Sequence, residues 1–522
     1  MHGSRLSVWG DAVRRNALAF PGKPAFIAGG RCLTFRQFNE RANRLNNALQ
    51  QLGLAKGDRV AILSRNRPEF VEAYGVAKSG LIAVPLNWRL SKRELLHPLQ
   101  DSRPCAILVE PEFVPLIDQL RGDVQGLRHF IGFDVREPGW LDYERLLGNA
   151  PDDEPQIPVR PDDVLCLMYT SGTTGRPKGA MHTHGGLMRN CEAAAQSLLH
   201  LSPDDVTLAV MPLFHVGGMW YHLFPSFASG CTTVMLSAFE PGAVLDAMER
   251  HRSTNVHLVP TMVHALVERM RNEPRERPRT LDHLRLIYYA ASSIPIEVLR
   301  AALTVFSSSR FVQSYGSTEA GIVTALTPED HARAVADSAS AGLLSSCGRA
   351  LGGVEMTVLD ADGRPAPAGS IDEIAVRGER TMAGYWPTRR VGGDDWLRTE
   401  DMGCIDENGY LSIIDRKHDM IVSGGENVYP CEVEEILYRD PDILEAAVFG
   451  MPDARWVEKV AAAVVLRPGS KATAEDIIGR ARLQLAGYKC PKTVILAESL
   501  PRTATGKVLK KELRQLYVSP RE

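Results

Sequence analysis

The spacing of apolar residues near the start of the chain predicts helices and strands in alternation. Thr34 and Gln37 have the spacing of a helix-capping box, in which each side chain bonds the other residue's backbone. Apolar side chains then recur three or four positions apart, at Phe38, Ala42, Leu45, Leu49 and Leu52. Residues 59–63 and 81–84 have the pattern of short buried strands, and Pro68 is placed to open a helix between them. This alternation predicts an α/β fold, with parallel-rich sheets covered by helices.

The same pattern continues through the middle of the chain. Four further apolar runs, each followed by a polar or glycine- and proline-containing loop, lie at residues 164–168, 206–210, 256–259 and 284–288. In open α/β folds, ligands bind at the loops that follow the carboxyl ends of the strands. We therefore expect the functional site in these loops.

The pattern changes after residue 349, which predicts a β-rich subdomain. Turn signals at residues 352–353, 360–363 and 406–409 separate short β-prone runs there. A charged segment at 415–419 then leads into a terminal block. This block has the order helix, strand, strand, helix, strand, over residues 431–437, 446–449, 460–466, 475–485 and 494–497. We predict a large N-terminal domain of residues 1–415 and a small α+β C-terminal domain of residues 416–522.

Composition agrees with this picture and excludes several classes of protein. With about 100 to 200 residues per domain, a chain of 522 residues should hold two or more domains. Hydrophobic residues make up 44% and charged residues 24%, and the net charge of −3 gives no reason to expect nucleic-acid or membrane-surface binding. The nine cysteines form no C-x-x-C pair, which argues against a zinc site or a disulfide framework. The apolar stretches are too short to cross a bilayer and no secretory signal is evident, so we expect a cytoplasmic protein.

Residues 169–179, Tyr-Thr-Ser-Gly-Thr-Thr-Gly-Arg-Pro-Lys-Gly, are the most informative segment. The three glycines allow a close backbone approach, four hydroxyl groups can donate hydrogen bonds, and Lys178 adds positive charge. These are the properties of a polyphosphate-binding loop, although the segment is not a Walker A loop. Composition alone leaves phosphate binding and a plain flexible connection equally well supported.

The full string resembles the signature of the AMP-binding, or adenylate-forming, superfamily, and the chain is similar to its acyl-CoA synthetase branch over nearly its whole length. The other matching motifs are Tyr-Gly-Ser-Thr-Glu at 315–319, Trp-Leu-Arg-Thr-Glu-Asp at 396–401, Asp-Arg-Lys at 415–417, Ser-Gly-Gly-Glu-Asn-Val-Tyr-Pro at 423–430 and Pro-Arg-Thr-Ala-Thr-Gly-Lys at 501–507. The resemblance implies an acid–thiol ligase that uses ATP, Mg²⁺ and coenzyme A. It would form an acyl-adenylate, release pyrophosphate, and then transfer the acyl group to CoA with release of AMP. It also implies that the C-terminal domain is mobile and rotates about a hinge at 415–417 between the two half-reactions.

The resemblance assigns catalytic roles to four residues. Lys507 would lie over the α-phosphate and the substrate carboxylate, where a cation offsets the charge of the transition state. Thr318 would contact phosphate, and Glu319 would hold Mg²⁺, which prefers carboxylate and phosphate oxygens. His215 would line the route to the carboxylate, although a buried structural histidine is an equally good interpretation.

The resemblance also implies the residues that bind ATP and CoA. They form the phosphate loop, a small-residue adenine loop, an adenine-stacking tyrosine, a ribose-binding Asp–Arg pair and part of a pantetheine tunnel. In chain order they are Thr170, Ser171, Gly172, Thr173, Thr174, Gly175, Lys178, Ala291, Ser292, Ser293, Tyr315, Gly316, Asp401, Arg416, Ser423, Gly424 and Gly425. The sequence departs from the family pattern at Glu400 and Val457, where glycine is common.

The substrate is the least constrained part of the prediction. Apolar and small side chains at 215–220, 288–293 and 315–317 suggest a hydrophobic acid, and we expect a medium- or long-chain fatty acid. The alternatives are an aryl-CoA ligase acting on a hydroxycinnamate or benzoate, and a stand-alone adenylation domain that loads a carrier protein. The partners expected are small molecules only, with a homodimer possible by analogy. A non-catalytic paralogue is disfavoured because four residues of the expected machinery are present, namely Glu319, Asp401, Arg416 and Lys507.

Overall fold

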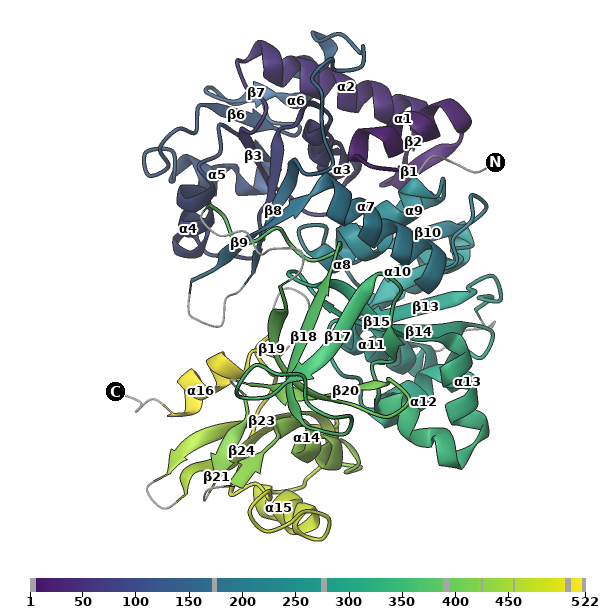
Figure 1. The fold of residues 1–522 in the computed structure, drawn as a ribbon, viewed down its shortest axis with the longest axis vertical. Coiled ribbons are helices and arrows are strands. Elements are labelled where there is room, and N and C mark those ends of the chain that lie inside the picture. The colour runs from purple at the N-terminus through teal and green to yellow at the C-terminus, as the bar shows by residue number, and fades with distance from the viewer. Residues whose placement is uncertain are drawn as a thin grey trace.

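The computed structural model describes residues 6–170, 176–273, 279–387, 395–417, 419–423, 426–453, 456–502 and 508–518. Figure 1 shows the elements near the N-terminus at one end of the long axis and the last sheet of the chain at the other. The predicted capping box is confirmed at the start of α2 (Phe35–Gln51), where the Gln37 N–H donates to the Thr34 hydroxyl at 3.2 Å. The Thr34 N–H donates in return to Gln37 Oε1 at 3.0 Å.

The first sheet is the predicted parallel sheet, closed at one edge by an antiparallel strand. Across the described residues it has seven strands, in the order β7 (Leu141–Asp142), β6 (His129–Gly132), β5 (Ala106–Val109), β3 (Arg59–Leu63), β4 (Ile82–Pro85), β8 (Val164–Thr170) and β9 (Lys178–Thr183). Among its described strands, β8 and β9 pair antiparallel and the other neighbours pair parallel. The helices in this stretch of sequence, besides α2, are α3 (Pro68–Tyr74), α4 (Lys92–Ser102), α5 (Val114–Asp118) and α6 (Tyr143–Gly148).

The second sheet is larger and has a parallel centre. In the described part of the chain it has nine strands, in the order β16 (Arg349–Ala350), β15 (Gly321–Leu326), β14 (Arg310–Ser317), β13 (Leu286–Ala290), β12 (Asn255–Leu258), β10 (Val206–Ala209), β11 (Thr232–Met235), β1 (Pro24–Ala28) and β2 (Arg31–Thr34). Its helices are α7 (His184–Ala193), α8 (Val216–Gly218), α9 (Phe224–Ala228), α10 (Pro241–His251), α11 (Pro260–Asn272), α12 (Ile296–Val305) and α13 (Pro328–Ala336). Strand β1, with the N-terminal helix α1 (Trp9–Ala19) before it, therefore pairs with a strand some 200 residues later.

The rest of the chain forms two smaller sheets, as the change of pattern after residue 349 predicts. An antiparallel sheet contains β17 (Val354–Leu359), β18 (Asp372–Gly378), β19 (Leu397–Ile405) and β20 (Leu411–Arg416). The last sheet contains β21 (Ile421–Ser423), β22 (Glu426–Val428), β23 (Ile443–Asp453), β24 (Val457–Leu466) and β25 (Thr493–Leu496), with α14 (Pro430–Tyr438), α15 (Ala474–Arg482) and α16 (Lys510–Val518). The predicted order of elements in the terminal block is confirmed, while the domain limits remain a prediction.

The main hydrophobic core lies between the two large sheets. Its cluster includes Ile62 from β3, Tyr288 from β13, and Trp9, Trp220 and Phe224 from the covering helical segments, all fully buried. Burial of this much apolar and aromatic surface is the principal force that holds the two sheets together.

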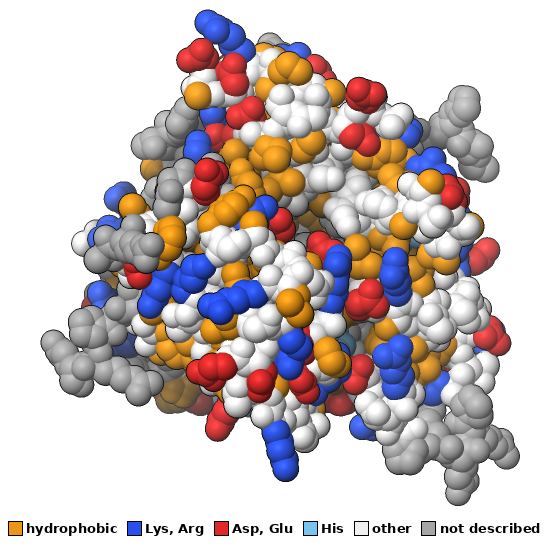
Figure 2. Space-filling view, turned by 90° about the horizontal axis from the view of Figure 1, so that it is seen from below, with side chains coloured by type: hydrophobic (Ala, Val, Ile, Leu, Met, Phe, Trp, Pro, Cys, Tyr) orange, Lys and Arg blue, Asp and Glu red, His pale blue; other side chains and the backbone are white. Residues whose placement is uncertain are grey.

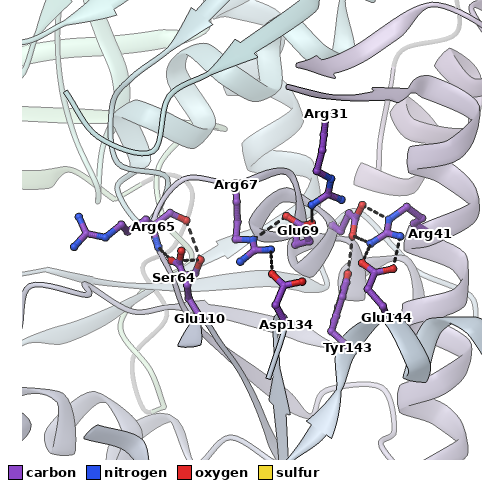
Figure 3. Close-up of polar contacts among 11 residues, drawn as sticks. Arg31, Arg41, Ser64, Arg65, Arg67, Glu69, Glu110, Asp134, Tyr143 and Glu144 are labelled. Atoms are coloured by element: carbon purple, nitrogen blue, oxygen red, sulfur yellow. Dashed lines mark hydrogen bonds and ion pairs between the residues drawn. The ribbon is translucent and has the colours of Figure 1, made fainter. Parts of the chain in front are cut away.

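A polar network joins α3 to its surroundings beside this core (Figure 3). Glu69 on α3 binds Arg31 at 2.6 Å and Arg67 at 2.8 Å, and Arg67 continues to Asp134 at 2.9 Å. Glu72, one turn further along, binds Arg41 at 2.6 Å, which fixes α3 against α2. Glu69 and Glu72 are both buried, so their charges depend on these partners.

The charged segment at 415–419 forms ion pairs both with the four-stranded sheet and with α16. Lys417 pairs with Glu373 on β18 at 3.2 Å, whereas Asp419 pairs with Arg514 on α16 at 3.0 Å. The surface at the end of the molecule that holds the last sheet carries interspersed acidic and basic side chains (Figure 2), in keeping with the small net charge. Among the helices that the structure describes, none has the length and apolar character needed to cross a membrane.

Candidate active site

A tight hairpin between β14 and β15 presents the predicted catalytic pair Thr318 and Glu319. A Cβ atom on Gly316 would lie 2.3 Å from the Gly321 carbonyl oxygen, so only glycine lets the two strands approach this closely. The backbone oxygen of Glu319 accepts a hydrogen bond from the Met382 N–H at 2.7 Å, which ties the turn to the segment after β18. The hairpin is therefore fixed from two sides.

The Glu319 side chain is connected to the phosphate-loop strand through Tyr385, a residue that the sequence analysis did not identify. The Tyr385 hydroxyl donates to Glu319 Oε1 at 3.1 Å, and Lys178 Nζ lies 5.2 Å from the centre of the Tyr385 ring. Burial, together with the negative charge of Glu319, raises the pKa of Tyr385 above its ordinary value, so its hydroxyl remains a donor. Lys178 and Glu319, predicted from motifs far apart in sequence, thus lie around one tyrosine ring.

Backbone pairing explains why Tyr385 reaches this position. The Ala383 N–H donates to the Met181 carbonyl at 2.8 Å, and the Trp386 N–H donates to the Gly179 carbonyl at 2.8 Å. The segment around Tyr385 therefore pairs with β9 and extends the edge of the seven-stranded sheet. Thr170, the last residue of β8, is the register partner of Lys178, so both ends of the predicted phosphate loop are fixed.

The predicted ribose-binding pair is brought together by two paired strands. Asp401 on β19 and Arg416 on β20 are register partners, and Arg416 Nε lies 3.5 Å from Asp401 Oδ1. The Tyr315 hydroxyl donates to Asp401 Oδ2 at 2.8 Å. Tyr315 is 7% exposed and packs in the core of the four-stranded sheet, so it orients Asp401 in addition to the stacking role implied by the resemblance.

Both departures from the family pattern adopt left-handed backbone conformations. Glu400, next to Asp401, has φ +62°, and Val457 at the start of β24 has φ +68°. The Glu400 carbonyl accepts a hydrogen bond from the Lys417 N–H at 3.0 Å. The fold therefore keeps the conformation for which glycine is suited even though neither residue is glycine.

The predicted adenine loop follows β13. Ala290 ends this strand and is buried, whereas Ala291 is exposed and has φ +78°. Ser292 is half-buried and Ser293 is exposed. The left-handed conformation of Ala291 lies directly after the end of β13, where the predicted loop begins.

His215 lies just before α8, beside the main core. Burial, and to a smaller extent the charge of Arg89, lowers the pKa of His215 to about 4, so the ring is neutral at pH 7. Its Nε2 atom is buried and has no partner among the described residues. Nearby, the guanidinium carbons of Arg65 and Arg89 lie 4.2 and 4.7 Å from the centre of the Trp88 ring. This basic group was not predicted, because its members carry no motif.

The remaining predicted residues divide between the described and undescribed parts of the chain. Ser423 lies on β21, buried, and its hydroxyl has no partner among the described residues. Residues outside the described ranges are Ser171, Gly172, Thr173, Thr174, Gly175, Gly424, Gly425 and Lys507. A cavity of about 280 Å³ lies beside the end of α7, near Arg189, Gly352 and Arg380, and none of the predicted residues lines it.

Comparison with known proteins identifies the family. Residues 13–386 match the family model of AMP-binding enzymes, and residues 432–507 match that of the AMP-binding enzyme C-terminal domain. Feruloyl-CoA synthase from Amycolatopsis sp is 38% identical, with 99% of this chain and 100% of that protein covered. Indoleacetate–CoA ligase from Aromatoleum aromaticum is also 38% identical, with 98% of each chain covered.

Two further proteins have a lower sequence identity to this chain but match it over nearly its whole length. A long-chain-fatty-acid–CoA ligase from Mycobacterium tuberculosis is 34% identical, with 97% of this chain and 98% of that protein covered. The crystal structure of the anthranilate CoA ligase AuaEII in complex with anthranoyl-AMP superimposes with a TM-score of 0.86 at 28% identity, with 98% of each chain covered. The chain therefore belongs to the AMP-binding, adenylate-forming enzyme family, as an AMP-forming acyl-CoA ligase.

Proposed function

We propose that this enzyme is an aryl-CoA ligase, which joins an aromatic carboxylic acid to coenzyme A and cleaves ATP to AMP and pyrophosphate. The substrate carboxylate attacks the α-phosphorus of ATP, a P–O bond forms, and pyrophosphate leaves. The thiol sulfur of CoA then attacks the carbonyl carbon of the acyl-adenylate, and AMP leaves. The similarity to ligases named for feruloyl and indoleacetate substrates supports this aryl alternative better than the fatty-acid expectation.

One structural observation carries the choice of an aromatic acid. Trp220, at the end of the predicted acyl-binding segment 215–220, is fully buried, and its ring lies 5.3 Å from those of both Tyr74 and Phe224. Trp9 in turn stacks on Phe224 at 5.6 Å. We infer that this continuous set of rings closes the acyl pocket behind Trp220, where a long alkyl chain would have to extend. A short planar acid would not need to displace these rings.

The site residues take their proposed roles from this arrangement. Lys178 and the phosphate loop would hold the phosphates of ATP, and Asp401 with Arg416 would bind the ribose hydroxyls. Glu319 fits a ligand of Mg²⁺, because its Oε2 atom has no partner among the described residues while Tyr385 orients the carboxylate through Oε1. When bound, Mg²⁺ would neutralise part of the negative charge on the phosphates.

The two-domain mechanism belongs to the same proposal. A C-terminal domain of residues 416–522 would rotate relative to residues 1–415, bringing first Lys507 and then the segment of Ser423, Gly424 and Gly425 to the adenylate. A reaction that consumes ATP and CoA suits the cytoplasm, where we place the enzyme.

A panel of acids with MgATP and CoA tests the proposal. We expect pyrophosphate and an acyl-CoA to form with ferulate or indole-3-acetate, with a kcat/KM that exceeds those for hexanoate and palmitate. The variant Lys507→Ala should lose pyrophosphate release with every acid while remaining folded. Faster turnover of palmitate than of any aromatic acid would contradict the aryl assignment. Adenylate formation without CoA acylation would point instead to a carrier-protein acceptor.

A further inference from the structure

His257 contacts two of the segments predicted to line the acyl pocket, at Gly217 and at Tyr288, although no motif identifies it. It is on β12 and is the register partner of Tyr288 on β13. The two rings stack with centroids 4.0 Å apart and planes 17° apart. Because register partners in a parallel sheet point to the same face, His257 shares the face on which Tyr288 joins the core with Trp220.

The hydrogen-bonding state of the His257 ring follows from its neighbours. Nδ1 lies 3.1 Å from the Gly217 carbonyl oxygen, and because a carbonyl only accepts, Nδ1 must carry the proton. Burial lowers the pKa of His257 well below its ordinary value, so the ring is neutral. In a neutral imidazole protonated at Nδ1, the other nitrogen is an acceptor. The ring therefore presents a lone pair at Nε2.

No described residue uses that lone pair. Nε2 of His257 is buried and lacks a hydrogen-bond partner within the described ranges. The polar side chains around it are engaged elsewhere. His222 bonds Asn255 Oδ1 at 2.8 Å, the Tyr288 hydroxyl bonds the Ser314 hydroxyl at 2.6 Å, and the Tyr221 hydroxyl donates to the Ser317 carbonyl at 2.6 Å. An unused acceptor in the interior is unusual, because most buried polar atoms are paired.

The position of this acceptor relates it to the substrate. Gly217, which holds the ring, follows His215 by two residues, and Tyr288 precedes Ala290 at the adenine loop by two residues. At about 3.3 Å per strand residue, Tyr288, and with it the stacked ring of His257, lies at a depth of roughly 7 Å below the loop. That depth corresponds to about the length of one aromatic ring. The far end of a bound aromatic acid would therefore come close to Nε2.

We propose that Nε2 of His257 accepts a hydrogen bond from a hydroxyl or ring N–H at the far end of the substrate, so that the enzyme selects aromatic acids that carry such a donor. This inference rests on the proposed aryl-CoA ligase function. Gly217 contributes by holding the imidazole in the required tautomer, and Tyr288 by fixing the plane of the ring. His257 would thus be a specificity-determining residue that contacts the substrate away from the reacting atoms.

Matched pairs of acids test this inference. The first pair is 4-hydroxycinnamate and cinnamate, and the second is indole-3-acetate and 1-methylindole-3-acetate. In at least one pair, we expect the donor-bearing acid to have a kcat/KM about tenfold or more above that of its partner, since one net hydrogen bond is worth about this factor. The pair that shows the preference identifies the donor as a hydroxyl or as a ring N–H. Equal turnover within both pairs would overturn the inference and leave the aryl-ligase function intact.

Substitutions then assign the preference to His257. His257→Phe keeps a ring that can stack on Tyr288 but lacks the acceptor, so the ratio within the pair should fall towards one, mainly through slower turnover of the donor-bearing acid. His257→Gln retains an acceptor and should restore part of the ratio. Thermal unfolding of each variant shows whether it is folded, and the wild-type ratio tests the inference even if neither variant folds.

His182→Phe is a matched control. His182 is also buried, its Nε2 also has no partner among the described residues, and burial lowers its pKa to about 4, but it lies on β9 in the other large sheet. Its substitution should leave the ratio unchanged. An equal fall of the kcat/KM ratio in both Phe variants, or no fall in His257→Phe, would show that His257 does not bind the hydrogen-bond donor of the substrate. If the wild-type enzyme turns over fatty acids and no aromatic acid, the proposed function fails and this inference fails with it.

Discussion

Glu400 and Val457 show at the level of single residues how the fold can override a local preference. Both have positive φ angles, +62° and +68°, at positions where the family resemblance implies glycine. A residue with a side chain pays a steric cost there, and a β-branched residue such as valine is the least suited of all. Glu400 lies next to Asp401, the predicted ribose-binding residue, whereas Val457 is 70% exposed and pairs in register with Ser423 on β21. The strain at Val457 is therefore the simpler one to measure.

Val457→Gly should stabilise the protein. Glycine relieves the strain of the left-handed conformation, which stabilises the folded state, but it also makes the unfolded chain more flexible, which offsets part of this effect. We expect a net gain of about 1 kcal/mol in the free energy of unfolding. Chemical denaturation followed by circular dichroism measures this change. Val422→Gly is the matched control, since Val422 is a partly exposed valine of the same sheet without a positive φ, and it should destabilise. A loss of stability in Val457→Gly comparable to that of the control would contradict the prediction.

Some residues of the site could not be predicted because their roles arise from distant contacts. Lys178, Glu319 and Asp401 belong to motifs that can be read locally. Tyr385 does not, because it meets Glu319 only after its segment pairs with β9, about 200 residues away in sequence. His257 is an isolated histidine within a buried strand, a pattern that usually indicates a structural residue.

At the level of elements, the β14–β15 hairpin depends on one glycine. Gly316→Ala would place a Cβ atom 2.3 Å from the Gly321 carbonyl oxygen, and because that neighbour is backbone, the strands would have to separate. The displacement would move Glu319, and we expect pyrophosphate release to fall by about 100-fold. Gly342→Ala is the control, since a Cβ there has no atom within 4 Å, and its activity should not change. Near-wild-type activity in Gly316→Ala would show that the hairpin tolerates the shift.

Helix α3 should make stability sensitive to acid through Glu69. Burial opposes the charge of this carboxylate, but the bonds and charges of Arg67 and Arg31 outweigh it and lower the pKa of Glu69 to about 2. A lowered pKa in the folded state adds stability above the ordinary pKa, and this stability is lost as the pH falls from about 4.5 to about 2. Glu69→Gln should thus cost about 2 to 3 kcal/mol near pH 7 and progressively less below pH 4.5.

Urea unfolding of the wild type and of Glu69→Gln across this pH range checks the prediction. A difference in stability that does not change with pH would show that the Glu69 charge contributes little. Glu112→Gln is a suitable control because it removes an ion pair with Arg65 in which both side chains are about one-third exposed or more. It should change stability by less than about 1 kcal/mol.

The elements themselves could largely be predicted, because their signals are local. The capping box of α2 and strand β3 are where the sequence pattern places them, and the terminal block has the predicted order. Most strand limits differ by one or two residues, as for β13, which begins at Leu286 where the apolar run begins at Leu284. Strand β23 differs more, since it spans Ile443–Asp453 where the pattern predicts residues 446–449. Such differences arise because backbone pairing, not hydrophobicity, decides where a strand ends.

At the scale of the whole molecule, the predicted rotation has a specific cost. The segment at 415–419 is bonded to the four-stranded sheet through Lys417 and Glu373, and to α16 through Asp419 and Arg514. Rotation of the C-terminal domain would separate Lys417 from Glu373 while Asp419 stays with its partner. The Lys417 side chain is 53% exposed, and the buried Glu373 keeps Arg398 as a partner at 2.9 Å, so the loss of this pair leaves no unpaired buried charge. This pair would therefore oppose the predicted rotation only weakly.

The pairing of β1 with β11 also has a consequence for how the chain acquires its structure during synthesis. Phe26 on β1 is the register partner of Thr233 on β11, so the first strand stays unpaired at that edge until more than 200 further residues have left the ribosome. At translation rates of about 5 to 20 residues per second, this wait is roughly 10 to 40 s. During it Phe26, Phe35 and Phe38, all buried in the finished enzyme, have no complete core to enter. The nascent chain therefore presents a long-lived apolar segment that is open to chaperones and, without them, to aggregation.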